Sequence, residues 1–131
     1  MDLKLNPSSS VPIYAQVVSQ VRALVASRAL RAGDQLPSIR DLAASLRINR
    51  NTAAKAYEAL ESDGVIEMRQ GHGCYVTGRG VTPWSKEERL RRLERAIDQA
   101  LVEAYHLGVP FEEIPGLVRR RLERFKKEES A

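Results

Sequence analysis

The chain has 131 residues, of which 43% are hydrophobic and 29% are charged, and its formal net charge is +4. This length accommodates one small domain with an appendage and excludes large multi-layer enzyme folds, while the single cysteine excludes an internal disulfide framework and a cysteine-based zinc cluster. No apolar run approaches the ~18 residues that a membrane helix needs and the start shows no secretory signal, so we expect a cytoplasmic protein without a membrane partner.

The first half of the chain carries the hydrophobic pattern of three helices. Residues 1–11 are expected to form a flexible lead-in, and the first helix should begin near Pro12 and end at the turn of residues 32–34. Ser38 can cap the second helix, and Asn49 can cap the third. Two helices joined by about three residues, each with one apolar face, are typical of a helix-turn-helix.

After the third helix, which should stop at Gly64, the hydrophobic period becomes that of strands. Residues 65–68 and 74–76 are expected to form two strands. The glycine-containing segment 69–73 between them is expected to be the tip of a β-hairpin. A hairpin directly behind the third helix is, in geometrical terms, a wing.

The hydrophobic pattern of the last third of the chain predicts two amphipathic helices. Ser85 and Glu88 have the spacing of a capping box for a long helix, which Gly108 should end. Pro110 should open a last helix, and the polar residues 126–131 are expected to fray.

The sequence therefore predicts a mostly α-helical fold with a small β-hairpin. We expect a winged helix-turn-helix domain at residues 1–77, a linker at 78–84 and a two-helix dimerisation tail at 85–131. Two amphipathic helices cannot bury both apolar stripes against each other, so the surplus needs a second copy of the chain or, as the alternative, the chain's own winged helix. The expected dimerisation residues are Leu90, Leu93, Ile97, Leu101, Tyr105, Phe111, Ile114, Val118, Leu122 and Phe125.

The start of the third helix carries residue types that read DNA. A helix-turn-helix places the amino end of its second helix in the major groove, where Arg can bind guanine and Asn can bind adenine through paired hydrogen bonds. That helix start also favours a phosphate, and glycines at the hairpin tip allow close approach of the backbone. The expected DNA-binding residues are Arg40, Asn49, Arg50, Asn51, Thr52, Lys55, Arg69, Gly71 and His72.

Each of these residues taken alone can be explained more simply as a polar side chain on a solvated helix face. The whole set, placed at the start of the third helix with a wing behind it, favours contact with DNA. A metal at His72 is not expected, because His106 is the only other histidine and lies in another segment. Cys74 is expected to pack as a small side chain within a strand. The arginine run 119–121 is more typical of a helix face with salt bridges than of a DNA contact.

The two alternatives to DNA binding are an enzyme and a module that binds proteins. The acidic pairs 112–113 and 128–129 form no facing dyad and the segment 71–73 is too short for a phosphate-binding loop, so we expect neither an enzyme nor a cofactor. A winged helix can also bind proteins, but such a module would expose apolar residues at the start of its third helix. A small-molecule effector stays open, and Tyr105 and Phe111 could contribute to its site.

An ordered set of residues resembles the winged-helix domain of GntR-type bacterial transcription regulators. In such regulators the positions matching Arg40, Arg50 and Gly71 commonly touch operator DNA. The family often has Ser or Thr at the position of Asn49 and Val at that of Ala53, so Asn49 is expected to alter base preference. The matching residues, which lie within about residues 10–77, are Pro12, Ile13, Tyr14, Gln16, Gly33, Asp34, Gln35, Leu36, Pro37, Ser38, Arg40, Leu42, Ala43, Leu46, Asn49, Arg50, Asn51, Thr52, Ala56, Tyr57, Leu60, Glu61, Gly64 and the segment 69–73.

The short tail resembles that of the YtrA-type subgroup, in which the tail serves dimerisation and whose members often sit beside transporter genes. It is too short for the larger effector domains of other subgroups or for the aminotransferase-like domain that binds pyridoxal phosphate. The resemblance implies a homodimeric repressor that binds an inverted-repeat operator on double-stranded DNA and controls a transporter operon. In such a homodimer the third helices of the two copies, which contact the bases, lie one DNA turn apart or a multiple of it.

Overall fold

The computed structural model describes residues 1–78 and 85–130, with the side chains of residues 1–78 and 85–126. The chain divides into two units, residues 1–82 and residues 83–131. Apart from Gly78, the predicted linker lies outside the described residues.

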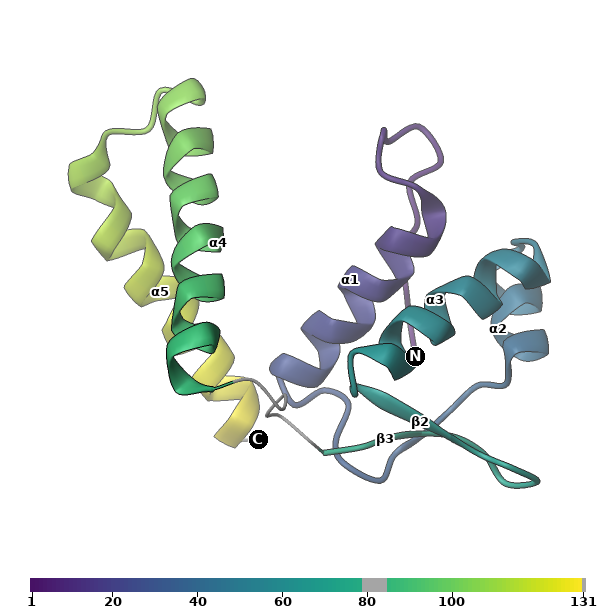
Figure 1. Cartoon of the computed structure of the whole chain (residues 1–131). Coiled ribbons are helices and arrows are strands. Elements are labelled where there is room, and N and C mark those ends of the chain that lie inside the picture. Colours follow the sequence, from purple (N-terminus) through teal and green to yellow (C-terminus); the bar gives the residue numbers. More distant parts are fainter. Residues whose placement is uncertain (79–84, 131) are drawn as a thin grey trace. The chain divides into compact units, whose positions relative to one another are not determined.

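The described part of the first unit contains three helices and a three-stranded antiparallel sheet. Figure 1 shows the three helices and the hairpin of β2 and β3. Its elements are α1 (Ile13–Ala26), β1 (Gln35–Leu36), α2 (Ile39–Leu46), α3 (Arg50–Ser62), β2 (Ile66–Arg69) and β3 (Gly73–Val76). The strand order is β1-β3-β2, so the hairpin of β2 and β3 gains a third strand from the segment before α2. The predicted winged helix-turn-helix is confirmed, whereas β1 was not predicted because two residues are too few to show a period.

The helices begin and end where the sequence provides the groups that satisfy their ends. The hydroxyl of Ser38 accepts a 3.0 Å hydrogen bond from the backbone N–H of Asp41, and the side-chain oxygen of Asn49 accepts a 2.7 Å bond from the N–H of Asn51. Gly64 follows α3 with a φ of +76°, which glycine adopts without strain. These contacts confirm the predicted starts of α2 and α3 and the end of α3.

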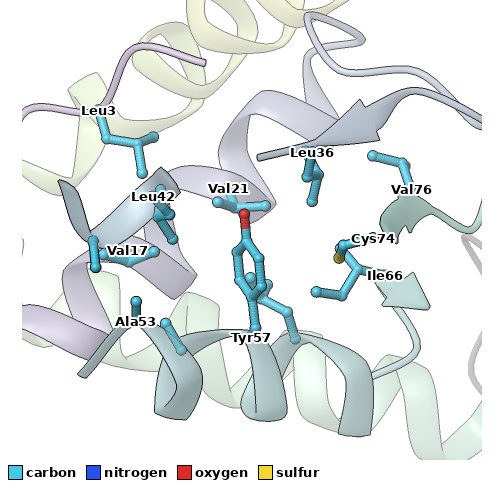
Figure 2. Close-up of a cluster of buried hydrophobic side chains, with 13 residues drawn as sticks. Leu3, Val17, Val21, Leu36, Leu42, Ala53, Tyr57, Ile66, Cys74 and Val76 are labelled. Atoms are coloured by element: carbon cyan, nitrogen blue, oxygen red, sulfur yellow. The ribbon is translucent and has the colours of Figure 1, made fainter. Parts of the chain in front are cut away.

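The core of this unit is one apolar cluster in which α3 is central. Figure 2 shows the ring of Tyr57 standing between side chains of α1 and α2 on one side and side chains of the sheet on the other. Val17 and Val21 of α1 and Leu60 of α3 have no exposed surface at all. Burial of each such side chain stabilises the fold by about 1.5–3 kcal/mol. The cluster therefore fixes α3 against both α1 and the sheet.

The prediction of a flexible lead-in is wrong, because the segment before α1 is bound to that helix. The side chain of Gln20 accepts a 2.8 Å hydrogen bond from the N–H of Lys4 and donates a 2.7 Å bond to its carbonyl oxygen. Gln16 makes the same pair of bonds to Asn6, at 2.8 and 2.9 Å. Each side-chain amide therefore binds both the N–H and the carbonyl oxygen of one backbone residue, and Leu3 of this segment lies in the core with 7% exposure.

The end of α1 also differs from the prediction. The helix stops at Ala26, well before the turn of residues 32–34. Ser27 is buried as its cap, and Arg28 takes a left-handed conformation with a φ of 66°. The N–H of Leu30 then donates a 3.0 Å bond to the carbonyl of Leu24, which closes the turn. A left-handed residue other than glycine gave no sequence signal for this end.

The second unit consists of two helices joined by a short 3₁₀ turn. Its elements are α4 (Lys86–His106), η1 (Phe111–Glu113) and α5 (Ile114–Ser130). The hydroxyl of Ser85 accepts a 3.1 Å bond from the N–H of Glu88, and Gly108 has a φ of +73° after α4, as predicted. Pro110 precedes the 3₁₀ turn rather than α5 itself. The backbone of residues 126–130, which was expected to fray, is assigned to α5, and fraying of this end stays a prediction.

The second unit has almost no core of its own. Among residues 85–126, Ala104 is the one buried side chain. The predicted dimerisation residues are instead largely exposed, with Leu93 57% and Tyr105 71% accessible to solvent. None of the helices in the two described ranges is both long and apolar enough to cross a bilayer.

Candidate nucleic-acid interface

The turn between α2 and α3 presents the start of α3 to solvent. Arg47 caps α2 in a left-handed conformation with a φ of 56°, and the N–H of Ile48 donates a 3.0 Å bond to the carbonyl of Ala43. The chain therefore reverses within three residues. Asn49, Arg50 and Asn51 are all exposed, while the predicted Thr52 is half-buried, so the polar start of α3 projects from the unit.

Two predicted arginines at this surface have no partner among the described residues. Arg40 lies in the first turn of α2, Arg50 is the first residue of α3, and both side chains are exposed. Within the described ranges neither side chain makes a hydrogen bond or an ion pair. An exposed guanidinium without a partner can donate paired hydrogen bonds to a phosphate or a guanine at no cost of breaking an existing contact.

Lys55 is held in place by an aromatic ring from another helix. Its ammonium nitrogen lies 4.1 Å from the centroid of the Tyr14 ring, near the start of α1. A cation at this distance is attracted to the ring face by about 0.5–1 kcal/mol at an exposed site. The contact fixes where the positive charge of Lys55 lies on the surface of α3.

The tip of the wing has a defined backbone because two side chains bind one carbonyl. The carbonyl oxygen of His72 accepts a 2.9 Å bond from the hydroxyl of Tyr75 and a 3.3 Å bond from the side-chain amide of Gln35. A Cβ at Gly73, whose φ is +109°, would lie only 2.9 Å from that amide nitrogen. Gly71 has a φ of +80° and open space around it. Glycine is therefore favoured at both Gly71 and Gly73 by conformation, and a Cβ at Gly73 would also displace the end of the Gln35 side chain.

Arg69 differs from the other predicted arginines in being paired. It lies at the end of β2, with a nitrogen 2.7 Å from a carboxylate oxygen of Glu67 and its guanidinium 4.4 Å from the ring centroid of Tyr75. Sequence reasoning missed Gln35, Glu67 and Tyr75 as partners of the wing. The signal that could have identified Glu67 is the alternation of side chains along a strand, which puts it on the same face as Arg69, two positions away.

Two of the segments that carry predicted DNA-facing residues lie toward one side of the first unit. In Figure 1 the turn between α2 and α3 and the loop between β2 and β3 both lie at the right-hand side. The run 119–121 belongs to the second unit, on α5. The described residues include no cluster of three or more His, Cys, Asp and Glu side chains that could hold a metal ion.

Two titratable groups lie buried behind this surface. Burial raises the pKa of the Cys74 thiol to about 11, and the charge of Glu61 adds to that shift. Burial also raises the pKa of the Tyr57 phenol above its ordinary value. Both groups therefore stay neutral at physiological pH and serve packing and hydrogen bonding, as expected for Cys74.

A helix-turn-helix that exposes Arg40 and Arg50, both unpaired among the described residues, with a braced hairpin behind it is typical of a DNA-binding protein of the winged-helix class. Residues 13–76 match the family described as bacterial regulatory proteins, gntR family. The chain is 34% identical over 112 residues to the HTH-type transcriptional repressor YtrA of Bacillus subtilis (strain 168), a match that covers 86% of this chain and 85% of that protein. The chain therefore belongs to the GntR family.

Solved structures agree with this assignment. A crystal structure named as a transcriptional antiterminator from Listeria monocytogenes EGD-e superposes with a TM-score of 0.79 at 28% identity, covering 95% of this chain and 92% of that chain. The DNA-binding domain of AraR in complex with operator ORX1 superposes with a TM-score of 0.51 at 27% identity, covering 57% of this chain and 93% of that chain. The protein is thus a DNA-binding transcriptional regulator, and its fold and relatives are those of regulators rather than enzymes.

Proposed function

We propose that the protein is a repressor that binds an inverted-repeat operator as a homodimer in the cytoplasm. The observation that carries the DNA-binding part is the pair of exposed arginines, Arg40 and Arg50, which have no partner within the described residues. In this proposal Arg50 and Asn51 contact base edges in the major groove. Arg40 and Lys55 contact phosphates, and the wing tip at Gly71 lies against the adjacent backbone.

The same surface argues against a module that binds proteins. The exposed residues at the start of α3 are Asn49, Arg50 and Asn51, which are polar or charged. Protein interfaces are distinguished by a core of aromatic and apolar side chains, and this surface offers none at the start of α3. The start of α3 is therefore better suited to a polyanion such as DNA than to a protein partner.

The homodimer is supported by the second unit. A two-helix unit with a single buried side chain among residues 85–126 cannot be stable by itself, because apolar burial is the main favourable term in folding. Leu93 and Ile97 on α4 and Leu122 on α5 each expose about half or more of their surface. A second copy of this unit would cover these faces symmetrically and would join two winged helices.

The proposals of repression and of transporter-operon control are supported by relatives of the chain and by its short tail, not by the surface that binds DNA. The relative in Bacillus subtilis is named a repressor, and regulators with this type of short tail often sit beside transporter genes. A repressor of this kind acts by occupying its operator, so its affinity for that sequence is the quantity to measure.

The test is a titration of the full chain against labelled DNA from upstream of its own gene, followed by fluorescence anisotropy. Scrambled DNA of the same length is the control, and both titrations use about 150 mM salt because non-specific affinity depends on salt. We expect a preference of about 1,000-fold or more and two protected half-sites in a footprint. Equal weak binding to both DNAs would contradict an operator at this place, and a single protected half-site would contradict the dimer.

A further inference from the structure

The outward face of the wing carries a connected set of side chains. Side chains alternate along a strand, so Glu67 and Arg69 of β2 lie on the face opposite to the buried Ile66. The register pairs Glu67 with Tyr75 of β3, and it pairs Tyr75 with Gln35 of β1. One row of the sheet therefore runs from Gln35 through Tyr75 to Glu67, beside Arg69.

Arg69 is held by two members of this row. Its Nε and Nη2 atoms lie 2.9 and 2.7 Å from the same carboxylate oxygen of Glu67, and its guanidinium lies 4.4 Å from the ring centroid of Tyr75. The carboxylate offsets the positive charge, and the ring covers one face of the guanidinium. Arg69 is thus engaged within the wing, unlike Arg40 and Arg50.

The wing tip does not depend on this ion pair. The hydroxyl of Tyr75 and the amide of Gln35 bind the carbonyl oxygen of His72 whether or not Arg69 stays on Glu67. Arg69 can therefore leave Glu67 for a phosphate while the tip keeps its conformation. The side chain of Arg69 is 52% exposed, so it can turn outward.

We propose that Glu67 is a specificity-determining residue, which holds Arg69 away from DNA phosphates until the wing is seated on the operator. This inference rests on the proposed DNA-binding function. Non-specific binding arises from phosphate contacts, so withholding one cation weakens binding to every sequence. The base contacts of α3 are unaffected, and the ratio of operator binding to non-specific binding rises.

The experiment measures binding of the full chain to a labelled mixed-sequence duplex in a salt series from about 50 to about 200 mM. Glu67→Gln keeps the shape of the side chain and removes its charge. We expect this variant to bind the duplex about two- to fivefold more tightly at low salt, the factor that corresponds to one exposed ion pair. The slope of log affinity against log salt should steepen by about 0.9, the value for one added phosphate contact.

Two comparisons isolate the role of the pair. In an Arg69→Gln background, Glu67→Gln should bring no gain, because the cation that Glu67 restrains is absent. Asp63→Asn makes the same change in net charge and also frees an exposed arginine, Arg22, which lies 4.0 Å from Asp63. Asp63 follows the end of α3, away from its DNA-facing start, so this variant should leave the slope unchanged.

The outcomes separate this inference from the proposed function. A gain of equal size in the Arg69→Gln background would overturn the inference, because Glu67 would then act only as a negative charge near DNA. Unchanged affinity of Glu67→Gln, or a slope that steepens equally in Asp63→Asn, would overturn it as well. All three outcomes leave DNA binding intact. A wild-type chain without salt-dependent affinity for the duplex would instead overturn the proposed function.

Discussion

The hydroxyl of Tyr57 donates a 2.7 Å hydrogen bond to the carbonyl oxygen of Pro37. Tyr57 lies in the middle of α3 and its side chain is 1% exposed, in the centre of the cluster that Figure 2 shows. Pro37 directly precedes Ser38, the cap of α2. The bond therefore joins the helix that is proposed to read DNA to the start of the helix that carries Arg40.

Replacing Tyr57 by Phe should destabilise the first unit by about 1–1.5 kcal/mol, because the half-buried carbonyl of Pro37 loses its partner while the ring remains. Urea denaturation at a fixed protein concentration measures this change in the free energy of unfolding. Tyr14→Phe is the control, since the described residues offer no hydrogen bond to the hydroxyl of Tyr14, and its effect should stay within about 0.5 kcal/mol. Equal losses in the two variants would contradict a structural role for the bond.

The helices could be predicted from the sequence because their signals are local. The capping residues Ser38, Asn49 and Ser85 each bind a backbone N–H two or three residues further along. The position of Arg50 on an exposed helix start follows from such a cap and the adjacent turn. The sequence therefore sufficed for α2, α3, the start of α4 and the exposure of the first residues of α3.

The features that were missed depend on partners distant in the sequence. Gln20 binds the backbone of Lys4, 16 residues away, and Gln35 binds that of His72, 37 residues away. No periodicity shows such pairs. The contact of Arg69 with the ring of Tyr75 likewise depends on the strand register. Its ion pair with Glu67 is the exception, because the two residues are two positions apart on one strand.

Arg50→Ala should weaken binding to the operator by about 1–3 kcal/mol, the range for loss of one bidentate contact to a base. The measurement is fluorescence anisotropy on the footprinted operator. Arg119→Ala on α5 removes the same charge from an exposed position in the second unit and should have little effect. If Arg119→Ala weakened binding as much as Arg50→Ala, the assignment of α3 as the reading helix would be wrong.

Leu3→Ala should lower the free energy of unfolding by about 2 kcal/mol or more, because it removes a buried side chain and leaves a cavity beneath the segment before α1. Val11→Ala is the matched control, since Val11 lies in the same segment and is 47% exposed. The difference between the two variants in urea denaturation tests the packing of this segment. A flexible lead-in would make both changes equally mild.

Ile97→Asp should convert the protein from dimer to monomer in analytical ultracentrifugation. Ile97 is 50% exposed on α4, and a carboxylate there would be buried without a partner when a second copy covers this face. Far-ultraviolet circular dichroism should show a loss of helix as well, because the second unit lacks a core without its partner. Gln99→Asp places the same charge two residues away, on another face of the helix, and should leave the dimer intact. A dimeric Ile97→Asp would exclude this face from the interface.

The stability of the first unit should fall in alkaline solution because of Cys74. Burial raises the pKa of this thiol from 9.0 to about 11 in the folded chain, so between these values the unfolded chain releases a proton that the folded chain retains. The stabilising contribution is complete below about pH 9 and is lost as the pH rises towards 11, by at most about 1.4 kcal/mol for each pH unit. Urea denaturation at a series of pH values across this range measures the slope. Cys74→Ala removes the thiol and should flatten the slope between about pH 9 and 10, below the range in which the raised pKa of Tyr57 adds a slope of the same sign. An unchanged slope between about pH 9 and 10 would assign the pH dependence to other residues.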